Sequence, residues 1–348
     1  MEDVGNRGQV DRARGALWGL ALGDALGMPT QTLTRAQIRA VYGPVDSLRD
    51  AVPDQPVSHG MPAGSVTDDT EQALLIGRLL VEGGGVVAPG RLADALVEWE
   101  RDMRARNADD LLGPSTRRAV DAILAGADPR TSGRGGHTNG AAMRIAPVGI
   151  ACPPEPVADL VEVVHEVSLP THDTHVALAG AAAVAAAVSG GVEGWEFPRS
   201  LDAALAAARV AEGLGAPFDS PSLPLRLVWA LGRARGLGDR EFEDFVAEDV
   251  GTSVRSEESV VAALVVADRF RGDLWGALCL AARLGDDTDT IGAMCGAVLG
   301  AHTGMAGIPE GPREQVGRVS GIDPAALVDA LLELRRHHGG AGTGGHRG

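Results

Sequence analysis

The run VALAGAAAVAAAVSGG, Val176 to Gly191, is the feature that most constrains what this chain can fold into. Alanine is the strongest helix former, and the run carries no charged residue that would mark a face turned to solvent. It is too short and too rich in alanine for a membrane span, which needs ~20 predominantly apolar residues. The run therefore predicts a helix that is buried on all sides in a protein core.

The rest of the chain favours helices that pack closely on one another. Hydrophobic residues make up 45% of the 348 residues but aromatic residues only 3%, whereas sheets are usually rich in aromatic and β-branched side chains. No convincing alternating strand pattern occurs. We predict an all-α fold with one domain over residues 1–338 and a disordered Gly-rich tail over 339–348. Apolar spacing and capping residues predict helices over residues 10–27, 67–85, 88–106, 114–125, 155–167, 172–189, 200–212, 225–237, 240–247, 257–270, 273–284, 289–301 and 324–337.

Charge and cysteine usage limit the partners and the compartment. The formal net charge of −16 disfavours nucleic acids and acidic membranes as partners, because the long-range field repels them. Cys152, Cys279 and Cys295 stand singly, which argues against a disulfide framework or a zinc site. The N-terminal residues contain no apolar segment typical of a signal peptide. We therefore expect a soluble, cytoplasmic protein without nucleic-acid or membrane partners.

Two predicted helices begin with clusters of threonine and aspartate, residues 67–70 (TDDT) and 287–290 (DTDT). A single Thr or Asp at such a place is explained by capping of the free backbone N–H groups, but a cap needs only one such residue. Adjacent carboxylates repel each other, and a bound Mg²⁺ or Ca²⁺ would relieve that repulsion through hard oxygen ligands. If the two helix starts face each other, they form a two-metal site. Spacing alone leaves this reading and surface capping equally open.

Three further segments contain polar residues in apolar or Gly-rich surroundings. Asp24 stands alone near the end of an apolar helix, and is either a turn residue facing solvent or a support for a metal site or a neighbouring loop. Residues 135–144 (GGHTNGAAMR) combine glycines, which allow close approach of a ligand, with Asn139, which suits sugar hydroxyls or caps the helix that follows. His172 and His175 precede the alanine-rich helix and, taken alone, indicate a capped helix start with surface histidines.

Together these segments resemble the ADP-ribosylglycohydrolase family, which includes the hydrolase that reactivates dinitrogenase reductase. The resemblance spans residues 15–304 in order. It rests on GALWGLALGDALGMP, TDDTEQAL, TNGAAMR, PTHDTHVALAGA and DTDTIGAMCGAVLGA. It implies a compact orthogonal helical bundle with two Mg²⁺ ions, or Mn²⁺, in a central cleft.

The resemblance also implies roles for individual residues. Metal contacts are expected from Thr67, Asp68, Asp69, Asp287, Asp289 and Thr290. Asp69, Asp287 and Asp289 are the expected catalytic residues, one of which takes a proton from the attacking water. Substrate contacts are expected from Asp24, Gln31, Gly136, His137, Asn139, Gly140 and His172.

Two positions depart from the family pattern. Asp286 replaces the second glycine of the usual GGDTDT, and either supports the metal ligands or points to solvent. Gln31 stands where members that cleave ADP-ribose from protein often carry Glu, and Gln cannot act as a base. With the MPTQ and LLGPST segments, the chain looks closer to a bacterial subgroup suspected of acting on smaller ribosides.

We therefore expect a Mg²⁺-dependent hydrolase of the glycosidic bond at the anomeric carbon of a ribosyl group. The expected partner is an ADP-ribosylated protein or a ribosyl-containing small molecule, with small nucleosides nearly as well supported as ADP-ribosyl adducts. A catalytically silent metal-binding member is an alternative. A metal-dependent phosphoesterase is another, because two-metal carboxylate sites serve that chemistry too.

Overall fold

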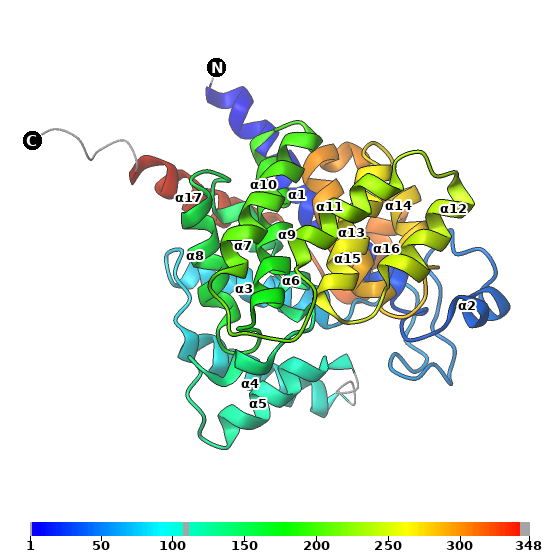
Figure 1. Cartoon of the computed structure of the whole chain (residues 1–348), viewed down its shortest axis with the longest axis horizontal. Helices are drawn as coiled ribbons and strands as arrows, with labels where there is room; N and C mark the ends of the chain where they lie inside the picture. Colours follow the sequence, from blue (N-terminus) through cyan, green and yellow to red (C-terminus); the bar gives the residue numbers. More distant parts are fainter. Residues whose placement is uncertain (1, 107–110, 342–348) are drawn as a thin grey trace, which may run out of the picture.

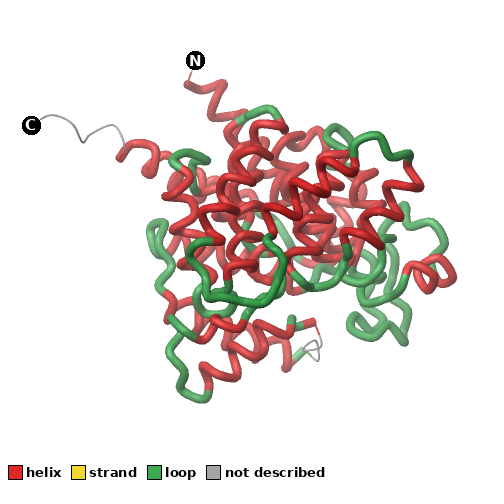
Figure 2. The backbone as a smooth tube through the Cα atoms, viewed as in Figure 1, coloured by secondary structure: helices red, strands yellow, loops and turns green. Residues whose placement is uncertain are grey.

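The computed structural model describes residues 2–106 and 111–341, and within these ranges every regular element is a helix (Figures 1 and 2). The described part contains seventeen α-helices and no β-strand. The predicted all-α class is therefore confirmed. The helices are α1 (Glu2–Gly27), α2 (Arg35–Val41), α3 (Asp68–Glu82), α4 (Pro89–Ala105), α5 (Pro114–Leu124), α6 (Gly140–Met143), α7 (Ala146–Ala151), α8 (Val157–Ser168), α9 (His175–Glu193), α10 (Phe197–Glu212), α11 (Leu223–Ala234), α12 (Asp239–Asp244), α13 (Ser256–Arg269), α14 (Leu274–Ala281), α15 (Thr288–Thr303), α16 (Glu310–Ser320) and α17 (Ala325–Ala341).

The most extensive helix contact in the described part of the chain is the antiparallel pairing of α1 with α15. Glycines of the two helices meet in three successive pairs, Gly15 with Gly300, Gly19 with Gly296 and Gly23 with Gly292. A Cβ atom added to Gly19 would lie 2.0 Å from the carbonyl oxygen of Gly296. The two backbones therefore touch directly, and a side chain at these positions would force the helices apart.

Helix α9 confirms the prediction of a helix buried on all sides. Its residues from Val176 to Val192 are buried, and it packs against α6, α7, α8, α10, α13 and α15. By length and composition alone, the 19 residues of α9 are sufficient to cross a membrane. The expectation that this segment is too short for a membrane span is therefore wrong. However, 94% of its most apolar window is buried inside the protein, which is typical of a core helix.

Several short helices were not predicted, because their signals are local and weak. Helix α2 begins with a capping box between Thr34 and Gln37, and α16 is polar along most of its length. The helix expected over 240–247 is instead the short α12 followed by a π-helix, Phe245–Val250. Helix α17 continues to Ala341, three residues into the predicted tail; the rest of that segment, 342–348, lies outside the described residues.

We predict that Gly19→Ala lowers the free energy of unfolding by about 1–3 kcal/mol or more, because the new methyl group meets backbone that cannot move aside. Gly232→Ala is the matched control. Gly232 lies in α11 with open space around the position of a Cβ atom, so alanine there should raise stability by about 0.5–1 kcal/mol. Urea unfolding of both variants checks this; equal effects of the two substitutions would contradict the backbone contact.

Candidate active site

The two acidic helix starts, residues 67–70 and 287–290, lie together in the structure. The hydroxyl group of Thr290, in the first turn of α15, donates to Asp69 Oδ2 in the first turn of α3 at 3.3 Å. Both clusters are thus at the N-termini of helices, where the helix dipole and free N–H groups favour negative charge. The two clusters face each other rather than solvent. The alternative interpretation, in which they only cap two separate helices at the surface, is therefore wrong.

Asp24, near the end of α1, is fully buried and holds the start of α3. Its carboxylate accepts from the backbone N–H of Thr67 at 3.0 Å and of Thr70 at 3.1 Å. It also accepts from both threonine hydroxyls, that of Thr67 at 2.9 Å. The expectation that it could be a solvent-facing turn residue is wrong. With four donors on its two oxygens, Asp24 orients the acidic cluster and has little capacity left for a ligand.

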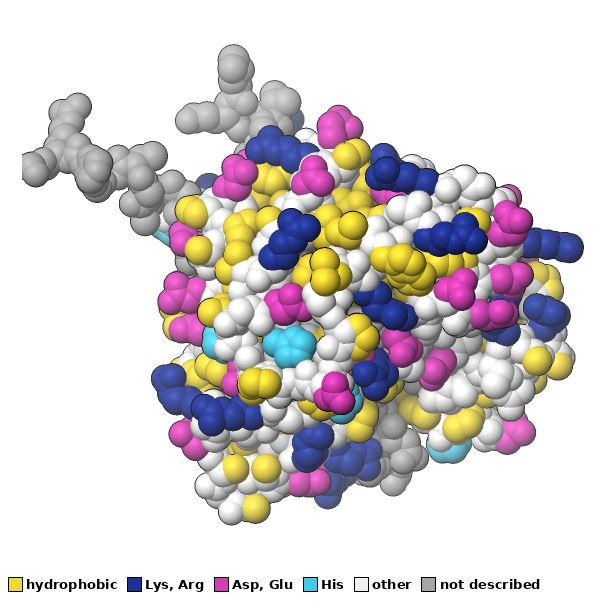
Figure 3. Space-filling view, viewed as in Figure 1, with side chains coloured by type: hydrophobic (Ala, Val, Ile, Leu, Met, Phe, Trp, Pro, Cys, Tyr) yellow, Lys and Arg dark blue, Asp and Glu magenta, His cyan; other side chains and the backbone are white. Residues whose placement is uncertain are grey.

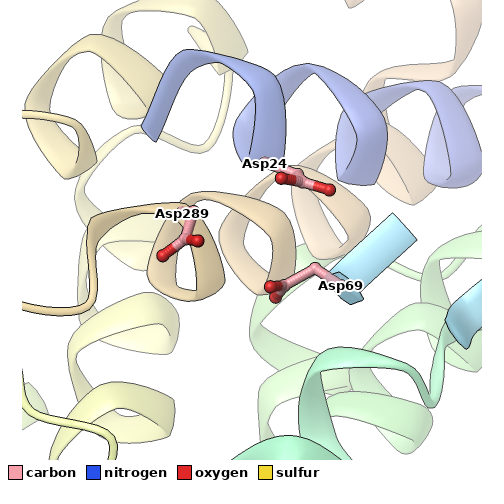
Figure 4. A group of neighbouring side chains, drawn as sticks. All are labelled: Asp24, Asp69 and Asp289. Carbon is pink, nitrogen blue, oxygen red and sulfur yellow. The ribbon is translucent and has the colours of Figure 1, made fainter. Parts of the chain in front are cut away.

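Asp69 and Asp289 each carry a buried carboxylate oxygen, Oδ1, without a hydrogen-bond partner among the described residues. Carboxylate oxygens of Asp24, Asp69 and Asp289 lie within 4.8 Å of one another. Figure 4 shows the three side chains, from α1, α3 and α15, directed toward a common space. An unpartnered buried carboxylate oxygen is costly, so this arrangement needs a positive partner or protons.

Burial dominates the electrostatics of this cluster. It raises the pKa of Asp69 well above its ordinary value, with repulsion from Asp289 next in importance. The pKa values of Asp68 and Asp289 are likewise well above the ordinary value, first through burial and then through neighbouring carboxylates. Burial also raises the pKa of Asp287 to about 7 and that of Asp24 to about 6.

The residues at this site fit a divalent cation. Unpaired carboxylate oxygens and threonine hydroxyls are the hard oxygen donors that Mg²⁺, Mn²⁺ or Ca²⁺ prefer. A bound cation would supply the missing partner of the unsatisfied oxygens and would offset the repulsion that raises the pKa values. The predicted ligands Thr67, Asp68, Asp69, Asp287, Asp289 and Thr290 all belong to the two helix starts described above.

A pocket of about 200 Å³ opens beside the cluster. Asp68, Asp287 and Asp289 line it, whereas Asp69 and Asp24 are not among its lining residues. Apolar side chains line much of the rest, namely Val57, Leu111, Leu112, Pro114, Met143 and Val254. The pocket thus combines a carboxylate-rich wall with apolar surface, which is typical of a small-molecule site.

Three of the predicted substrate-binding residues line this pocket: Gln31, Asn139 and Gly140. Asn139 donates from Nδ2 to Asp287 Oδ2 and to the hydroxyl of Ser259 at 2.8 Å, so its amide fixes one carboxylate of the wall. Gln31 is mostly buried and donates to the carbonyl of Met28 at 3.3 Å. The loop after Pro29 therefore contributes Gln31 to the same pocket as Asp68, Asp287 and Asp289.

The other predicted substrate-binding residues do not line the pocket. His172 is fully buried and lies behind Gly140, so it is neither a surface histidine nor part of the pocket wall. Gly136 lies on the same buried side, where its carbonyl accepts from Thr174 at 2.6 Å. His137 stacks on Phe218 with the ring centroids 4.2 Å apart. The Gly-rich segment therefore reaches the pocket only from Thr138 onward.

Asp286 lies next to Asp287 but, unlike the other aspartates of this segment, at the exposed surface. It is exposed, and its φ of 62° lies in the left-handed region where glycine is favoured. Its backbone N–H donates to Leu33 at 2.9 Å and its carbonyl accepts from Thr32 at 2.6 Å. Of the two roles expected for this residue, the structure shows the one that faces solvent.

Sequence reasoning missed several polar residues around the site. Ser259 lies on a helix whose apolar pattern indicated only core packing, and it contacts Asn139. Gln72 stands in the TDDTEQAL segment but was not singled out there, and it contacts Asp68. Thr138 lines the pocket, and Arg144 is buried behind it. Both residues stand in the GGHTNGAAMR segment, so that segment contained the signal, but only the fold shows which of its side chains face the pocket.

Fold and site together define a class: an all-helical protein with a buried aspartate cluster that could bind a metal ion beside a small-molecule pocket. The chain belongs to the ADP-ribosylglycohydrolase family, whose model matches residues 6–341. Family membership makes the protein a hydrolase acting on glycosyl bonds, so the enzyme class expected from the sequence is confirmed.

Similar proteins cover nearly the whole chain. Protein YegU of Escherichia coli K12 is 32% identical over 94% of this chain and 98% of its own. The ADP-ribosyl dinitrogen reductase glycohydrolase of Rhodospirillum rubrum is 28% identical over 93% of this chain and 96% of its own. A solved structure titled ADP-ribosylglycohydrolase-related protein complex superposes with a TM-score of 0.67 at 27% identity, covering 95% of this chain and 99% of that one.

We predict that the metal-free protein becomes less stable as the pH rises from about 4 to 7. A carboxyl whose pKa is raised on folding stabilises the folded state below its unfolded pKa of ~4, and that contribution is lost as pH rises through the folded value. Asp24 and Asp287, with pKa values of about 6 and about 7, set this window. Thermal unfolding in EDTA between pH 4.5 and 8 measures the trend, and Mg²⁺ or Mn²⁺ should restore stability at pH 8. A metal-free melting temperature that rises across this range would contradict the assignment.

Proposed function

We propose that the protein is a Mg²⁺-dependent hydrolase that cleaves the bond between the anomeric carbon of a ribosyl group and its leaving group. One observation carries the proposal: Asp68, Asp287 and Asp289 form a wall of a pocket that also has apolar sides. The family assignment supplies the reaction type, and the donor set supports an oxygen-ligated cation.

Asp289 is the best-placed proton acceptor among the three expected catalytic residues. It lines the pocket and keeps Oδ1 free of protein hydrogen bonds. Asp69 has a free oxygen too but does not line the pocket, and both oxygens of Asp287 accept hydrogen bonds, from Thr290 at 3.2 Å and from Asn139. In the proposed reaction a water oxygen bonds to the anomeric carbon, its proton passes to Asp289, and the leaving group departs with the electrons of the broken bond and is protonated from solvent.

The remaining carboxylates stabilise the transition state. Positive charge develops on the ribosyl ring when the glycosidic bond breaks, and a fixed group of negative charges beside the pocket favours it. Asp69, Asp289, Asp68 and Asp287, with the hydroxyls of Thr67 and Thr290, would hold two Mg²⁺ ions. When bound, these ions supply Lewis acidity that lowers the pKa of a nearby water and orients hydroxyl groups.

An ADP-ribosyl adduct is the preferred substrate. The Rhodospirillum rubrum relative is named for an ADP-ribosylated protein, and the first turn of α5, at Pro114 and Thr116, lines this pocket. The residue before that turn is Gly113, which has no side chain to cap the helix. Pro114 has no N–H group, so the N–H groups of Ser115 and Thr116 are the donors that this turn offers to an anion such as phosphate. On the face drawn in Figure 3 acidic and basic side chains are interspersed, so a partner protein would meet no single-sign field there.

A small nucleoside is the second candidate, and the pocket favours it on two counts. Its volume of about 200 Å³ is below the ~300–1,000 Å³ of most ligand pockets. The described residues that line it include no Arg or Lys to pair with a diphosphate. Under this alternative the base would lie on the apolar side and the ribose on the carboxylates.

Product release decides between the candidates. Peptides carrying ADP-ribosyl arginine or ADP-ribosyl serine, a nucleoside panel and a phosphodiester are incubated with Mg²⁺, with Mn²⁺ or with EDTA. Cation-dependent release of ADP-ribose supports the proposal, and release of free base from nucleosides supports the second candidate. Hydrolysis of the phosphodiester alone would identify a phosphoesterase, and no turnover of any substrate would identify a silent metal-binding member.

We predict that Asp289→Asn lowers kcat by at least about 100-fold while the protein stays folded, because general-base groups typically contribute 10²–10⁴-fold. The variant removes one charge but little volume, and it reduces repulsion in the cluster, so the metal-free protein should not lose stability. Asp286→Asn is the matched control, since Asp286 is exposed three residues away. Steady-state kinetics and thermal unfolding of both variants test this prediction. Turnover by Asp289→Asn at the wild-type rate would show that Asp289 has only a structural role at the start of α15.

We further predict that Gln31→Glu introduces an acidic limb into the pH–rate profile or raises activity on protein-linked ADP-ribose. The introduced carboxyl would be a new ionisable group at the pocket, acting only when deprotonated, so its contribution appears as the pH rises. The wild-type rate should stay flat to mildly acidic pH. Identical profiles and identical substrate preference for the two proteins would show that Gln31 is remote from the chemistry.

A further inference from the structure

Arg144, the residue that ends α6, is buried without lining the pocket, and its guanidinium connects two chains of hydrogen bonds. Only 1% of its surface is exposed. Nη1 donates to Gln72 Oε1 at 2.7 Å and Nη2 donates to the hydroxyl of Thr171 at 2.6 Å. A guanidinium has only donors, so it fixes the orientation of both partners.

The first chain leads to the carboxylate wall. Gln72 lies one turn after Asp68 on α3, and its amide Nε2 donates to Asp68 Oδ2 at 3.2 Å. Because Arg144 occupies the amide oxygen, the amide nitrogen must face Asp68 rather than the reverse. Arg144 thus holds the Asp68 side chain in place through one intervening residue.

The second chain leads to another residue that lines the pocket, Thr138. Thr171 Oγ1 lies 2.7 Å from His172 Nδ1, the one acceptor available to its hydroxyl among the described residues, so Thr171 donates and Nδ1 accepts. The proton of the neutral ring is then on Nε2, which donates to Thr138 Oγ1 at 3.1 Å. Thr138 lines the pocket, and its own hydroxyl hydrogen is left to donate to a ligand.

We propose that Arg144 is a positioning residue that orients Asp68 on the cation side and the Thr138 hydroxyl on the ligand side. Thr138 is then a specificity residue that donates to an oxygen of the bound ligand, such as a sugar hydroxyl. Burial, with Arg144 second, lowers the pKa of His172 and keeps the ring neutral, which this arrangement requires. The identity of the ligand rests on the proposed function; the two hydrogen-bond chains do not.

Two variants separate the chains. Thr171→Val breaks only the chain to His172, and Gln72→Met breaks only the chain to Asp68. Long-range ¹H–¹⁵N NMR of the metal-free protein reports which ring nitrogen of His172 carries the proton, with His172→Gln used to assign the signal. Mn²⁺ titration reports the affinity of the cation site.

The wild type should show His172 as the neutral Nε2–H form. Thr171→Val should shift the Nδ1 resonance and populate the second tautomer without changing Mn²⁺ affinity. Gln72→Met should weaken Mn²⁺ binding by about tenfold or more and leave the His172 signals in place. An Nδ1–H tautomer in the wild type, unchanged His172 signals in Thr171→Val, or equal loss of Mn²⁺ affinity in both variants would overturn the proposal.

The ligand-side role is tested on the substrate that the wild type hydrolyses. Thr138→Val should lower kcat/KM by about three- to tenfold, the value of one neutral hydrogen bond, and Thr138→Ser should restore it. Equal losses in the two variants would assign Thr138 to packing alone. If the wild type turns over no ribosyl substrate while the NMR and Mn²⁺ results separate as expected, the proposed function fails and the positioning role of Arg144 stands. Arg144→Lys tests both chains of hydrogen bonds at once. If this variant fails to fold, Thr171→Val and Gln72→Met, which each break one chain, test the proposal without it.

Discussion

The direct contact between the backbones of α1 and α15 is the constraint on which the site depends. Three glycine pairs bring the helices together without side chains between them. One turn beyond the last pair, Gly27 meets the backbone of Asp289 itself, with the position of its Cβ only 2.4 Å from Asp289 Cα. This contact fixes the start of α15 against the end of α1, and Asp24 on α1 in turn holds the start of α3. Three helices distant in sequence therefore deliver their carboxylates to one place.

Holding several carboxylates together in a buried site is unfavourable, and the fold offsets that cost in a graded way. Asp24 is satisfied by four donors, Asp287 by Asn139 and Thr290, and Asp68 by Gln72. Only Asp69 and Asp289 of this cluster keep a fully buried oxygen without a partner among the described residues. The unsatisfied buried oxygens are thus confined to two carboxylates of the group that could bind a metal ion, and perturbed groups of this kind are concentrated at functional sites.

The same principle extends to the neutral side of the pocket. A glycosidase must bind a sugar through hydrogen bonds whose directions are fixed before the substrate arrives, because reorganisation costs catalytic rate. In this protein a single buried guanidinium directs one amide toward a carboxylate and one imidazole toward a pocket hydroxyl. The apolar residues and the uncapped turn at Gly113 complete the lining of the pocket.

The sequence alone determined the elements whose signals are local. Apolar periodicity and capping residues predicted most helices and the buried character of α9. The two acidic helix starts were also evident, because they contain more carboxylates than capping requires. The resemblance to a family then supplied the reaction type.

Only the tertiary structure decided which side chains meet. It buried His172 outside the pocket lining and left Asp286 exposed. It bonded Asp24 to the start of α3. It also brought three further residues into the site, Gln72, Thr138 and Arg144. The physical reason is that capping and periodicity are set within a few residues along the chain. The direction of a side chain near a helix end depends instead on contacts such as the α1–α15 glycine pairs, which join positions more than 250 residues apart.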